Sequence, residues 1–226
     1  MAAEPAGLAV ESAVPAGLTS EVAPNGTSGA TSESTATTAL SAAQRARRER
    51  IVQAAISLLE SGEYEAIQMR DVAATAGVAL ATVYRYFSSK EHLYAAALLD
   101  WSKSFAERAD VVLEGGNDEE RLRELLRRIV RAFERWPQML RAEVTLTASQ
   151  DPQARACYAE WASRNRGALE AALPTLSAED AIAVVDITGT VVASRLREWA
   201  LGRCSIDDVN ESVQRTVDMI FTFPVS

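Results

Sequence analysis

The chain has 226 residues, and 48% of them are hydrophobic, which suffices for one or two domains with a sizeable core. A formal net charge of −8 argues against nucleic-acid binding by the chain as a whole, but the charge is uneven: residues 1–40 carry four Glu and no Lys or Arg, whereas residues 41–95 hold seven Lys/Arg against six Asp/Glu. The two cysteines lie far apart without a CxxC motif, which argues against a disulfide framework or a zinc site and favours a reducing, cytoplasmic location.

The first forty residues are rich in Ala, Ser, Thr, Gly and Pro and contain no aromatic residue. Such a segment cannot bury enough apolar surface to offset its ordering entropy, so we predict a disordered tail over residues 1–40. It lacks the basic start and continuous apolar core of a signal peptide. No stretch of the chain approaches the ~18 apolar residues that a membrane span needs, so no membrane partner is expected.

A basic run opens the first helix expected after the tail. Arg45, Arg47 and Arg48 stand close together with only Glu49 as an acidic neighbour. A local basic arm of this kind favours contact with DNA phosphates more than the net charge opposes it. The alternative is an ordinary solvated helix face, and for any single arginine the two readings are equally open.

Residues 68–91 read QMRDVAATAGVALATVYRYFSSKE and predict two short helices joined by a tight turn and followed by a third. Gly77 stands where such a turn needs a residue that tolerates positive φ. In the second helix, from about Leu80 to Phe87, the residues at inward spacing are Leu80, Val83 and Phe87. This is the arrangement of a helix-turn-helix, which offers its second helix to the DNA major groove.

The outward residues of this motif suit DNA. Arg85 can fork onto guanine, Thr82 and the hydroxyls of Tyr84 and Tyr86 can reach phosphates, and the methyl groups of Ala79 and Ala81 can meet thymine. Lys90 is expected at a phosphate. The alternative is a motif used only for packing. The complete set of expected DNA-binding residues is Arg45, Arg47, Arg48, Gln68, Met69, Arg70, Ala79, Ala81, Thr82, Tyr84, Arg85, Tyr86 and Lys90.

The stretch AGVALATVYRYFSSKEHLYAAAL, residues 76–98, resembles the TetR family of bacterial transcriptional regulators. It departs from the family pattern at Ala81, where Gly is usual, and at Ser88 and Ser89, where Pro is frequent. Weaker similarity, in YEAIQMRDVA, VYRYFSSKEHL and REWALGRCSIDDVNESVQRTVDMI, links the chain to the KstR group of steroid-catabolism repressors. That resemblance implies control of lipid or sterol degradation genes and release by a bulky acyl-CoA or steroid-like compound.

The rest of the chain is expected to be helical. Ser88 and Glu91 form a capping-box pattern for a helix running to about Leu113. Asn117 is expected to cap the next helix, which stops where Trp136 meets Pro137, and a shorter helix follows to about Ser149. The later helix caps are expected at Asp151, Ser177 and Ser205.

Aromatic and long apolar residues concentrate in these middle helices, where a regulator would hold a small hydrophobic effector. The alternative for each residue alone is core packing. The expected effector-pocket residues are Trp101, Phe105, Phe133, Trp136, Met139, Leu140, Tyr158 and Trp161. Arg141 and Arg164 are candidate partners for an acidic effector group, but the surface reading is favoured for both.

The last two helices, about residues 178–201 and 206–221, carry long stripes of small and β-branched residues. Periodicity alone favours an internal core stripe, whereas the resemblance to TetR regulators implies a homodimer through these helices. An isologous four-helix interface would set two recognition helices roughly 34–36 Å apart. The expected interface residues are Val184, Ile187, Val191, Val192, Val213, Val217 and Ile220.

The sequence therefore predicts an all-α protein with three parts: a tail over 1–40, a three-helix DNA-binding domain with a helix-turn-helix over 41–88, and an effector-binding and dimerisation domain over 89–226. The expected function is a TetR-like regulator, a repressor released from a palindromic double-stranded operator by a small hydrophobic effector. The alternative is a helical interaction module of the same fold without an effector or with lost operator specificity. No enzyme, cofactor or metal is indicated, because the single His92 has no nucleophile partner and no phosphate-binding glycine loop occurs.

Overall fold

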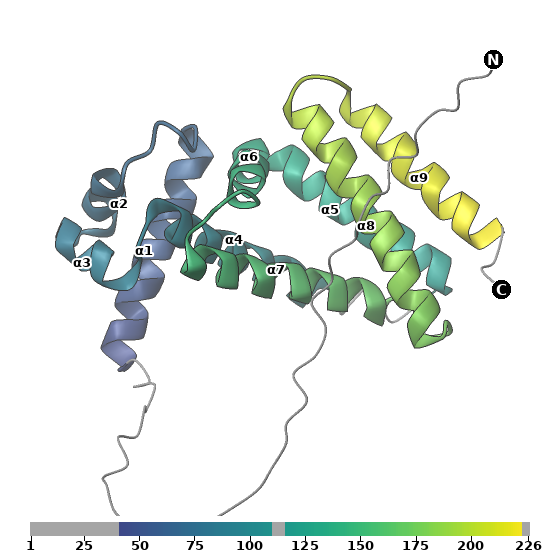
Figure 1. Ribbon diagram of the computed structural model, residues 1–226, viewed down its shortest axis with the longest axis horizontal. Helices are drawn as coiled ribbons and strands as arrows, with labels where there is room; N and C mark the ends of the chain where they lie inside the picture. The colour runs from purple at the N-terminus through teal and green to yellow at the C-terminus, as the bar shows by residue number, and fades with distance from the viewer. Residues whose placement is uncertain (1–40, 110–115, 223–226) are drawn as a thin grey trace, which may run out of the picture. The chain divides into compact units, whose positions relative to one another are not determined.

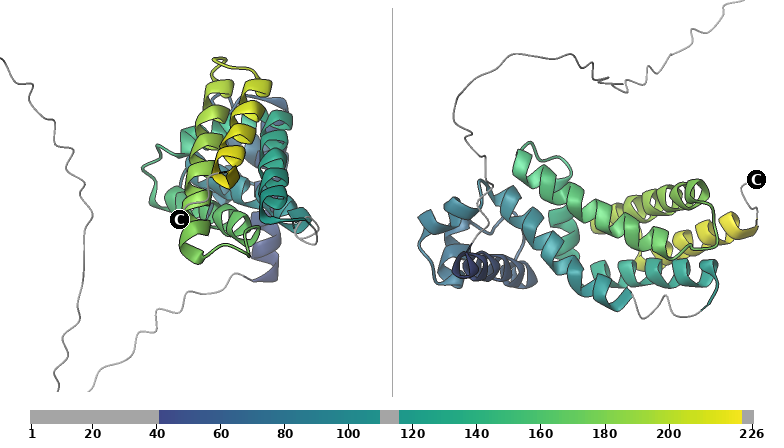
Figure 2. Two further views of the ribbon diagram at one scale, coloured as in Figure 1. Left: turned by 90° about the vertical axis from the view of Figure 1, so that its right-hand side faces the viewer. Right: turned by 90° about the horizontal axis from the view of Figure 1, so that it is seen from below.

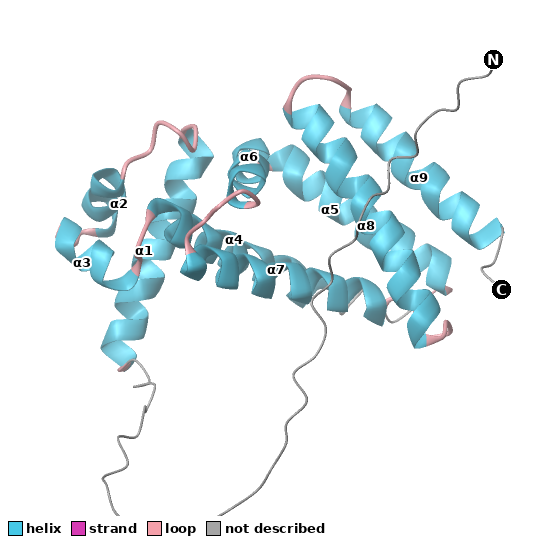
Figure 3. Ribbon diagram, viewed as in Figure 1, coloured by secondary structure: helices cyan, strands magenta, loops and turns pink. Residues whose placement is uncertain are grey.

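The computed structural model describes residues 41–109 and 116–222, with side chains up to residue 103 and again from residue 116. Its described part is all α-helical, without strands, as predicted (Figure 1, Figure 3). The tail expected over residues 1–40 lies outside the described residues. The helices are α1 (Ala42–Ser61), α2 (Met69–Ala76), α3 (Leu80–Tyr86), α4 (Lys90–Ala109), α5 (Asp118–Arg135), α6 (Pro137–Leu146), α7 (Pro152–Ala171), α8 (Ala178–Ala200) and α9 (Ile206–Thr222).

Helices α1, α2 and α3 form the expected helix-turn-helix unit. Ser41 caps the start of helix α1 in a capping box. Its side chain accepts a hydrogen bond from the Gln44 backbone N–H, and its own backbone N–H donates to the Gln44 side chain. Gly77 ends α2 in the left-handed region with φ 65°, as the turn requires. Val83 and Phe87 are fully buried beneath the unit, so α3 is held by its inner face and leaves its outer face to solvent.

The structure corrects the expected start of α4. Ser89, rather than Ser88, caps the helix, because its Oγ accepts a hydrogen bond from the His92 backbone N–H at 2.9 Å. Ser88 instead donates its hydroxyl to Asp151 at 2.8 Å. The expected end of this helix near Leu113 falls outside the described residues.

The other expected caps are confirmed. Asn117 and Glu120 form a reciprocal capping box at α5, and Asp151 accepts hydrogen bonds from the backbone of Gln153 and Ala154 at α7. Ser177 and Ser205 cap α8 and α9. Helix α6 starts at Pro137 as expected, but it ends at Leu146, three residues earlier than predicted.

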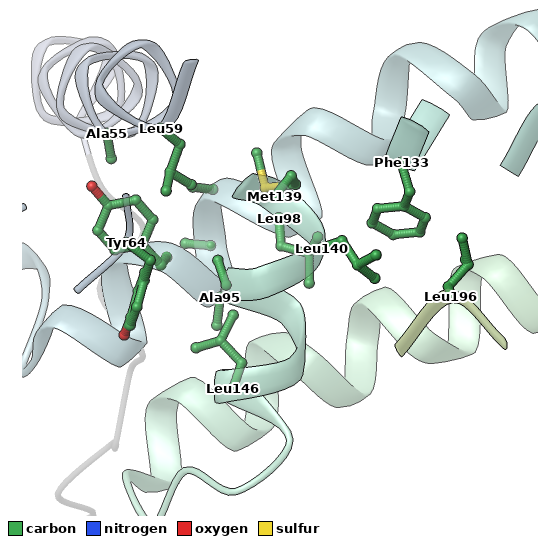
Figure 4. Packing of buried hydrophobic residues seen from close by; sticks show 14 of the residues in the cluster. Ala55, Leu59, Tyr64, Ala95, Leu98, Phe133, Met139, Leu140, Leu146 and Leu196 are labelled. Atoms are coloured by element: carbon green, nitrogen blue, oxygen red, sulfur yellow. The ribbon is translucent and has the colours of Figure 1, made fainter. Parts of the chain in front are cut away.

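A continuous apolar core joins the helix-turn-helix unit to the later helices. Figure 4 shows Leu59 and Tyr64 at one end, Leu98, Met139 and Leu140 in the middle, and Phe133 with Leu196 at the other end. Helix α4 provides this continuity because it packs on α1 at one end and runs along α7, its most extensive partner (Figure 1). Helices α8 and α9 lie side by side, and α9 also packs on α5 (Figure 2).

The expected dimer stripe is in large part an internal one. Four of its members are buried inside the single chain, where α8 and α9 pack on each other and on α5: Val184, Val192, Val213 and Val217. Val191 and Ile220 are half-buried, and Ile187 is 48% exposed. The apolar period of a helix marks its buried face, and here that face is covered by the chain's own helices.

Two glycines offer a matched test of the turn. Gly77→Ala is expected to cost about 1–2 kcal/mol, because a Cβ strains the left-handed backbone although it meets no atom within 4 Å. Gly167→Ala, inside α7 and also free of neighbours, is expected to stabilise the protein by about 0.5–1 kcal/mol. Urea unfolding of both variants measures the two effects, and shifts of the same sign would contradict the assignment.

Candidate functional site

Helix α3 presents a small, open face with one cation. The exposed residues are Ala79, Leu80, Ala81, Tyr84 and Arg85, and the Arg85 guanidinium lies 5.6 Å from the Tyr86 ring centre. Leu80 was expected to face inward with Val83, but at the first position of α3 it is 41% exposed. The short side chains permit close approach to DNA, and Arg85 suits a base edge.

Other expected DNA contacts lie elsewhere. Met69 is 8% exposed and belongs to the core. The Tyr86 hydroxyl is buried, so it does not face solvent as a phosphate contact would, and Thr82 is half-buried. Gln68 and Arg70 are exposed at the start of α2, where Arg70 lies 3.8 Å from Asp71.

Lys90 serves the fold of the helix-turn-helix unit itself. Its Nζ donates to the backbone carbonyls of Tyr64 and Glu65 and stands 4.2 Å from the centre of the Tyr64 ring. Burial lowers the pKa of this amine, against the opposing effect of Glu65 and Glu91. Lys90 therefore connects the start of α4 to the turn after α1 by hydrogen bonds, rather than extending toward a phosphate as expected.

The arginines of the first two turns of α1 divide into two groups. Arg45 is exposed and Arg47 is half-buried. Arg48 points to the unit's own core edge, with its guanidinium 5.0 Å from the centre of the Phe87 ring. Arg45 and Arg47 thus remain the candidates for the DNA backbone on this helix.

A cavity of about 890 Å³ lies among α4, α5, α6, α7 and α8. Four of the expected effector residues line it, namely Trp101, Phe133, Leu140 and Trp161. Trp136 and Met139 instead line a separate cavity of about 330 Å³ beside the end of α1. Tyr158 does not line the cavity but donates its hydroxyl to Glu143, which does, and the Phe105 side chain lies outside the described residues.

The lining is apolar within and basic at its edge. Arg128, Arg131, Arg135 and Arg164 border the cavity, and we call them the arginine rim. Three of them lie on α5 and were not among the predicted pocket residues, although their spacing of three and four residues places them on one face of the helix. Arg164, expected at the surface, is half-exposed, pairs with Glu160 at 2.5 Å and also borders the cavity. Arg141 lies away from it and faces Glu63 at 3.4 Å.

One carboxyl group stands in the cavity wall. Glu143 accepts a hydrogen bond of 2.6 Å from the Tyr158 hydroxyl. Burial raises the pKa of Glu143, while the Tyr158 hydrogen bond and the charge of Arg197 act in the opposite direction. Burial also raises the pKa of Tyr158, so the phenol keeps its proton at neutral pH and remains the donor.

Within the residues that the structure describes, no group of His, Cys, Asp and Glu side chains is arranged to hold a metal ion. Among these same residues no helix has the length and apolar character needed to cross a membrane.

A helix-turn-helix followed by a helical domain with a large apolar cavity is the architecture of a class of DNA-binding regulators. The family model described as "Bacterial regulatory proteins, tetR family" matches residues 51–97, and that of "Tetracyclin repressor-like, C-terminal domain" matches residues 115–220. The chain therefore belongs to the TetR family and is a DNA-binding transcriptional repressor of that family.

Curated relatives agree with this assignment. The chain is 36% identical over 182 residues to the HTH-type transcriptional repressor KstR of Rhodococcus jostii (strain RHA1), covering 79% of this chain and 84% of the relative. It is 34% identical over 185 residues to KstR of Mycolicibacterium smegmatis, covering 80% and 89%. The expected resemblance to the KstR group is thereby confirmed.

Solved structures share the fold. A TetR transcriptional regulator from Rhodococcus sp. RHA1 superposes with a TM-score of 0.66 at 28% identity, over 79% of this chain and 96% of that one. FadR of Thermus thermophilus, solved with lauroyl-CoA, gives a TM-score of 0.63 at 19% identity, over 79% and 95%. FadR of Bacillus subtilis, solved with stearoyl-CoA, gives 0.61 at 17% identity, over 75% and 96%.

Proposed function

We propose that this repressor binds a palindromic double-stranded operator as a homodimer and is released by an acyl-CoA with a large apolar acyl group. Residues 41–88 read DNA, and residues 89–226 hold the effector and the dimer contacts. The protein acts in the cytoplasm, where its operator lies, and it is a regulator rather than an enzyme.

The observation that carries the effector class is the 890 Å³ cavity with its arginine rim. Buried aromatic and aliphatic side chains suit an acyl or sterol-like body, and guanidinium groups at the edge suit phosphates. The lauroyl-CoA and stearoyl-CoA of the FadR structures belong to those proteins, but a shared fold makes the same ligand class a reasonable first panel. The relationship to KstR adds sterol-derived acyl-CoA compounds to the panel of ligands to be tested.

The test starts with selection of random DNA duplexes by the purified full chain. The selected operator is then titrated with protein in the presence of lauroyl-CoA, stearoyl-CoA or free coenzyme A. We expect sequence-specific binding ~10³-fold or more above bulk DNA, and release by acyl-CoA but not by free coenzyme A. Binding without sequence preference would favour the interaction-module alternative, and an operator complex that ignores all acyl-CoA compounds would overturn the effector class.

Arg85 is expected to read a base. Arg85→Ala should weaken operator binding by about 1–3 kcal/mol and relax the preference at one position in each half-site, as loss of a bidentate guanine contact does. Arg47→Ala is the matched control, because a phosphate contact carries no sequence information and its loss weakens all duplexes alike. Repeating the duplex selection with both variants measures this, and an unchanged preference in Arg85→Ala would reject the base contact.

The dimer surface is expected on the exposed apolar residues of the last two helices rather than on the buried stripe. Ile182 and Ile187 of α8 and Met219 of α9 are large and exposed in the single chain. Ile187→Asp should therefore shift sedimentation from dimer to monomer, because the interface would bury an unpaired carboxylate. Leu80→Asp, a similarly exposed site on α3, should leave the dimer intact. A dimer that survives Ile187→Asp would place the interface elsewhere.

A further inference from the structure

The turn that leaves the recognition helix is tied to the start of α7. Ser88 lies between Phe87, which ends α3, and Ser89, which caps α4. Its hydroxyl donates to Asp151 Oδ2 at 2.8 Å. The other oxygen of the same carboxylate, Oδ1, accepts from the backbone N–H groups of Gln153 at 2.7 Å and Ala154 at 3.1 Å. One side chain thus caps α7 and holds the exit of α3.

Two aromatic rings stand beside this contact, and the Ser88 Oγ also lies 3.1 Å from His92 Nδ1. Phe87 is fully buried, with the Arg48 guanidinium 5.0 Å and the His92 ring 5.2 Å from its ring centre. The backbone N–H of Ser88 donates to His92 Nδ1 at 3.2 Å. Burial lowers the pKa of His92, with Asp151 and Arg48 acting in opposite directions, so at neutral pH the imidazole is neutral and Nδ1 can accept.

The carboxylate is charged under ordinary conditions. Hydrogen bonds from Ser89 and Ser88 and from the α7 backbone lower the pKa of Asp151 to about 2, against the opposing effect of burial. A hydroxyl that donates to a carboxylate makes a stronger hydrogen bond than a neutral pair does.

The two helices that meet at this contact also line the effector cavity. Trp101 and Lys103 come from α4, and Trp161 and Leu169 come from α7. Trp161 comes ten positions after Asp151, which corresponds to roughly 15 Å along the helix. Since α4 and α7 pack along each other, a ligand that changed their relative position would also change the distance between Asp151 and Ser88.

We propose that the hydrogen bond between Ser88 and Asp151 is a latch that holds the recognition helix in its DNA-binding position, and that Asp151 is a positioning residue for operator binding. The latch goes beyond the proposed effector, because it acts on the protein without ligand. It is also the contact through which a change at the cavity would reach the DNA-reading unit.

The test is a double-mutant cycle on operator affinity in the full chain without ligand. Ser88→Ala removes the hydroxyl that donates to Asp151 Oδ2 and leaves both the Ser89 hydrogen bond to Asp151 and the α7 cap in place. Asp151→Ser keeps a capping hydroxyl for α7 but is too short to reach Ser88. Each variant should weaken operator binding roughly 3- to 10-fold, and the double variant should lose no more than Asp151→Ser alone. Ser163→Ala, an exposed serine of α7, is the control and should bind as the wild type does.

The direction of the Asp151→Ser effect separates the latch from simpler explanations. Removal of a negative charge strengthens DNA binding by electrostatics alone, whereas loss of the latch weakens it. If Ser88 only contacted a phosphate, Ser88→Ala would weaken binding and Asp151→Ser would not. Tighter or unchanged operator binding by Asp151→Ser, or additive losses in the double variant, would overturn the latch. All of these measurements are made without ligand, so none of their outcomes depends on whether acyl-CoA is the effector.

Discussion

Replacement of Asp118 by alanine is expected to lower the free energy of unfolding by about 3–5 kcal/mol, the usual cost of removing one partner from a buried ion pair. Asp118 is 3% exposed at the start of α5. It pairs with Arg121, and its Oδ2 accepts hydrogen bonds from the Thr175 backbone at 3.1 Å and the Thr175 hydroxyl at 2.7 Å. The alanine variant leaves a buried guanidinium without its counter-charge and frees the connection between α7 and α8.

The loss of unfolding free energy in Asp118→Ala should lie toward the lower end of that range. Arg121 keeps hydrogen bonds to the backbone carbonyls of Ala172 and Gly116, so its side chain is not left wholly unsatisfied. Asp186→Ala is the matched control, because Asp186 pairs with Arg166 at 2.5 Å while both side chains are about half exposed. That loss should stay below about 1 kcal/mol. Equal losses for the two variants in urea unfolding would show that burial does not set the strength of the Asp118 pair.

Local chemistry made most helix boundaries predictable. Gly77, Asn117 and Pro137 each satisfy a backbone requirement that few other residues meet, and the structure uses them as expected. The start of α4 was placed one residue early because two adjacent serines offered alternative caps and Glu91 completed a capping-box pattern for the first. The contact of Ser88 with Asp151, 63 residues away, settles the choice, and no local pattern contains it.

The site was predictable where exposure follows from helical period, and not where partners come from distant segments. The period placed Arg85 and Tyr84 on the outer face of α3, where the structure has them. It could not show that Lys90 turns back to the carbonyls of Tyr64 and Glu65. The same limit explains the dimer stripe: Val213 and Val217 repeat as an interface would, but periodicity does not tell burial within one chain from burial between two.

Three of the six aromatic residues predicted for an effector pocket line the cavity, namely Trp101, Phe133 and Trp161, and the basic residues of its lining were not predicted. Trp101 and Trp161 come from α4 and α7 and meet only in the folded chain. The arginines of α5 were overlooked because a charged stripe reads as a solvated face, and these side chains are in fact partly solvated while they border the cavity. Whether such a stripe faces bulk water or a cavity edge depends on the helices packed beside it.

Filling the cavity should uncouple the effector from DNA. Gly189 of α8 lines the cavity, and a Cβ added there meets no atom within 4 Å. Gly189→Phe should therefore occupy ligand space without strain in the helix. In the wild type, saturating lauroyl-CoA is expected to weaken operator binding 5- to 150-fold, a coupling of about 1–3 kcal/mol. In Gly189→Phe that factor should fall toward one while operator affinity without ligand stays unchanged, because Gly189 is remote from α1 and α3.

Gly167→Phe provides the matched control, since Gly167 is an exposed position of α7 that does not line the cavity. It carries the same side-chain change and should keep the full response. Linkage adds a second requirement, which is that operator DNA weakens lauroyl-CoA binding by the same factor by which lauroyl-CoA weakens operator binding. Titrations in both directions measure the two factors. A full response in Gly189→Phe would place the ligand outside the cavity, and unequal factors in the wild type would show that ligand and DNA do not compete through one two-state equilibrium.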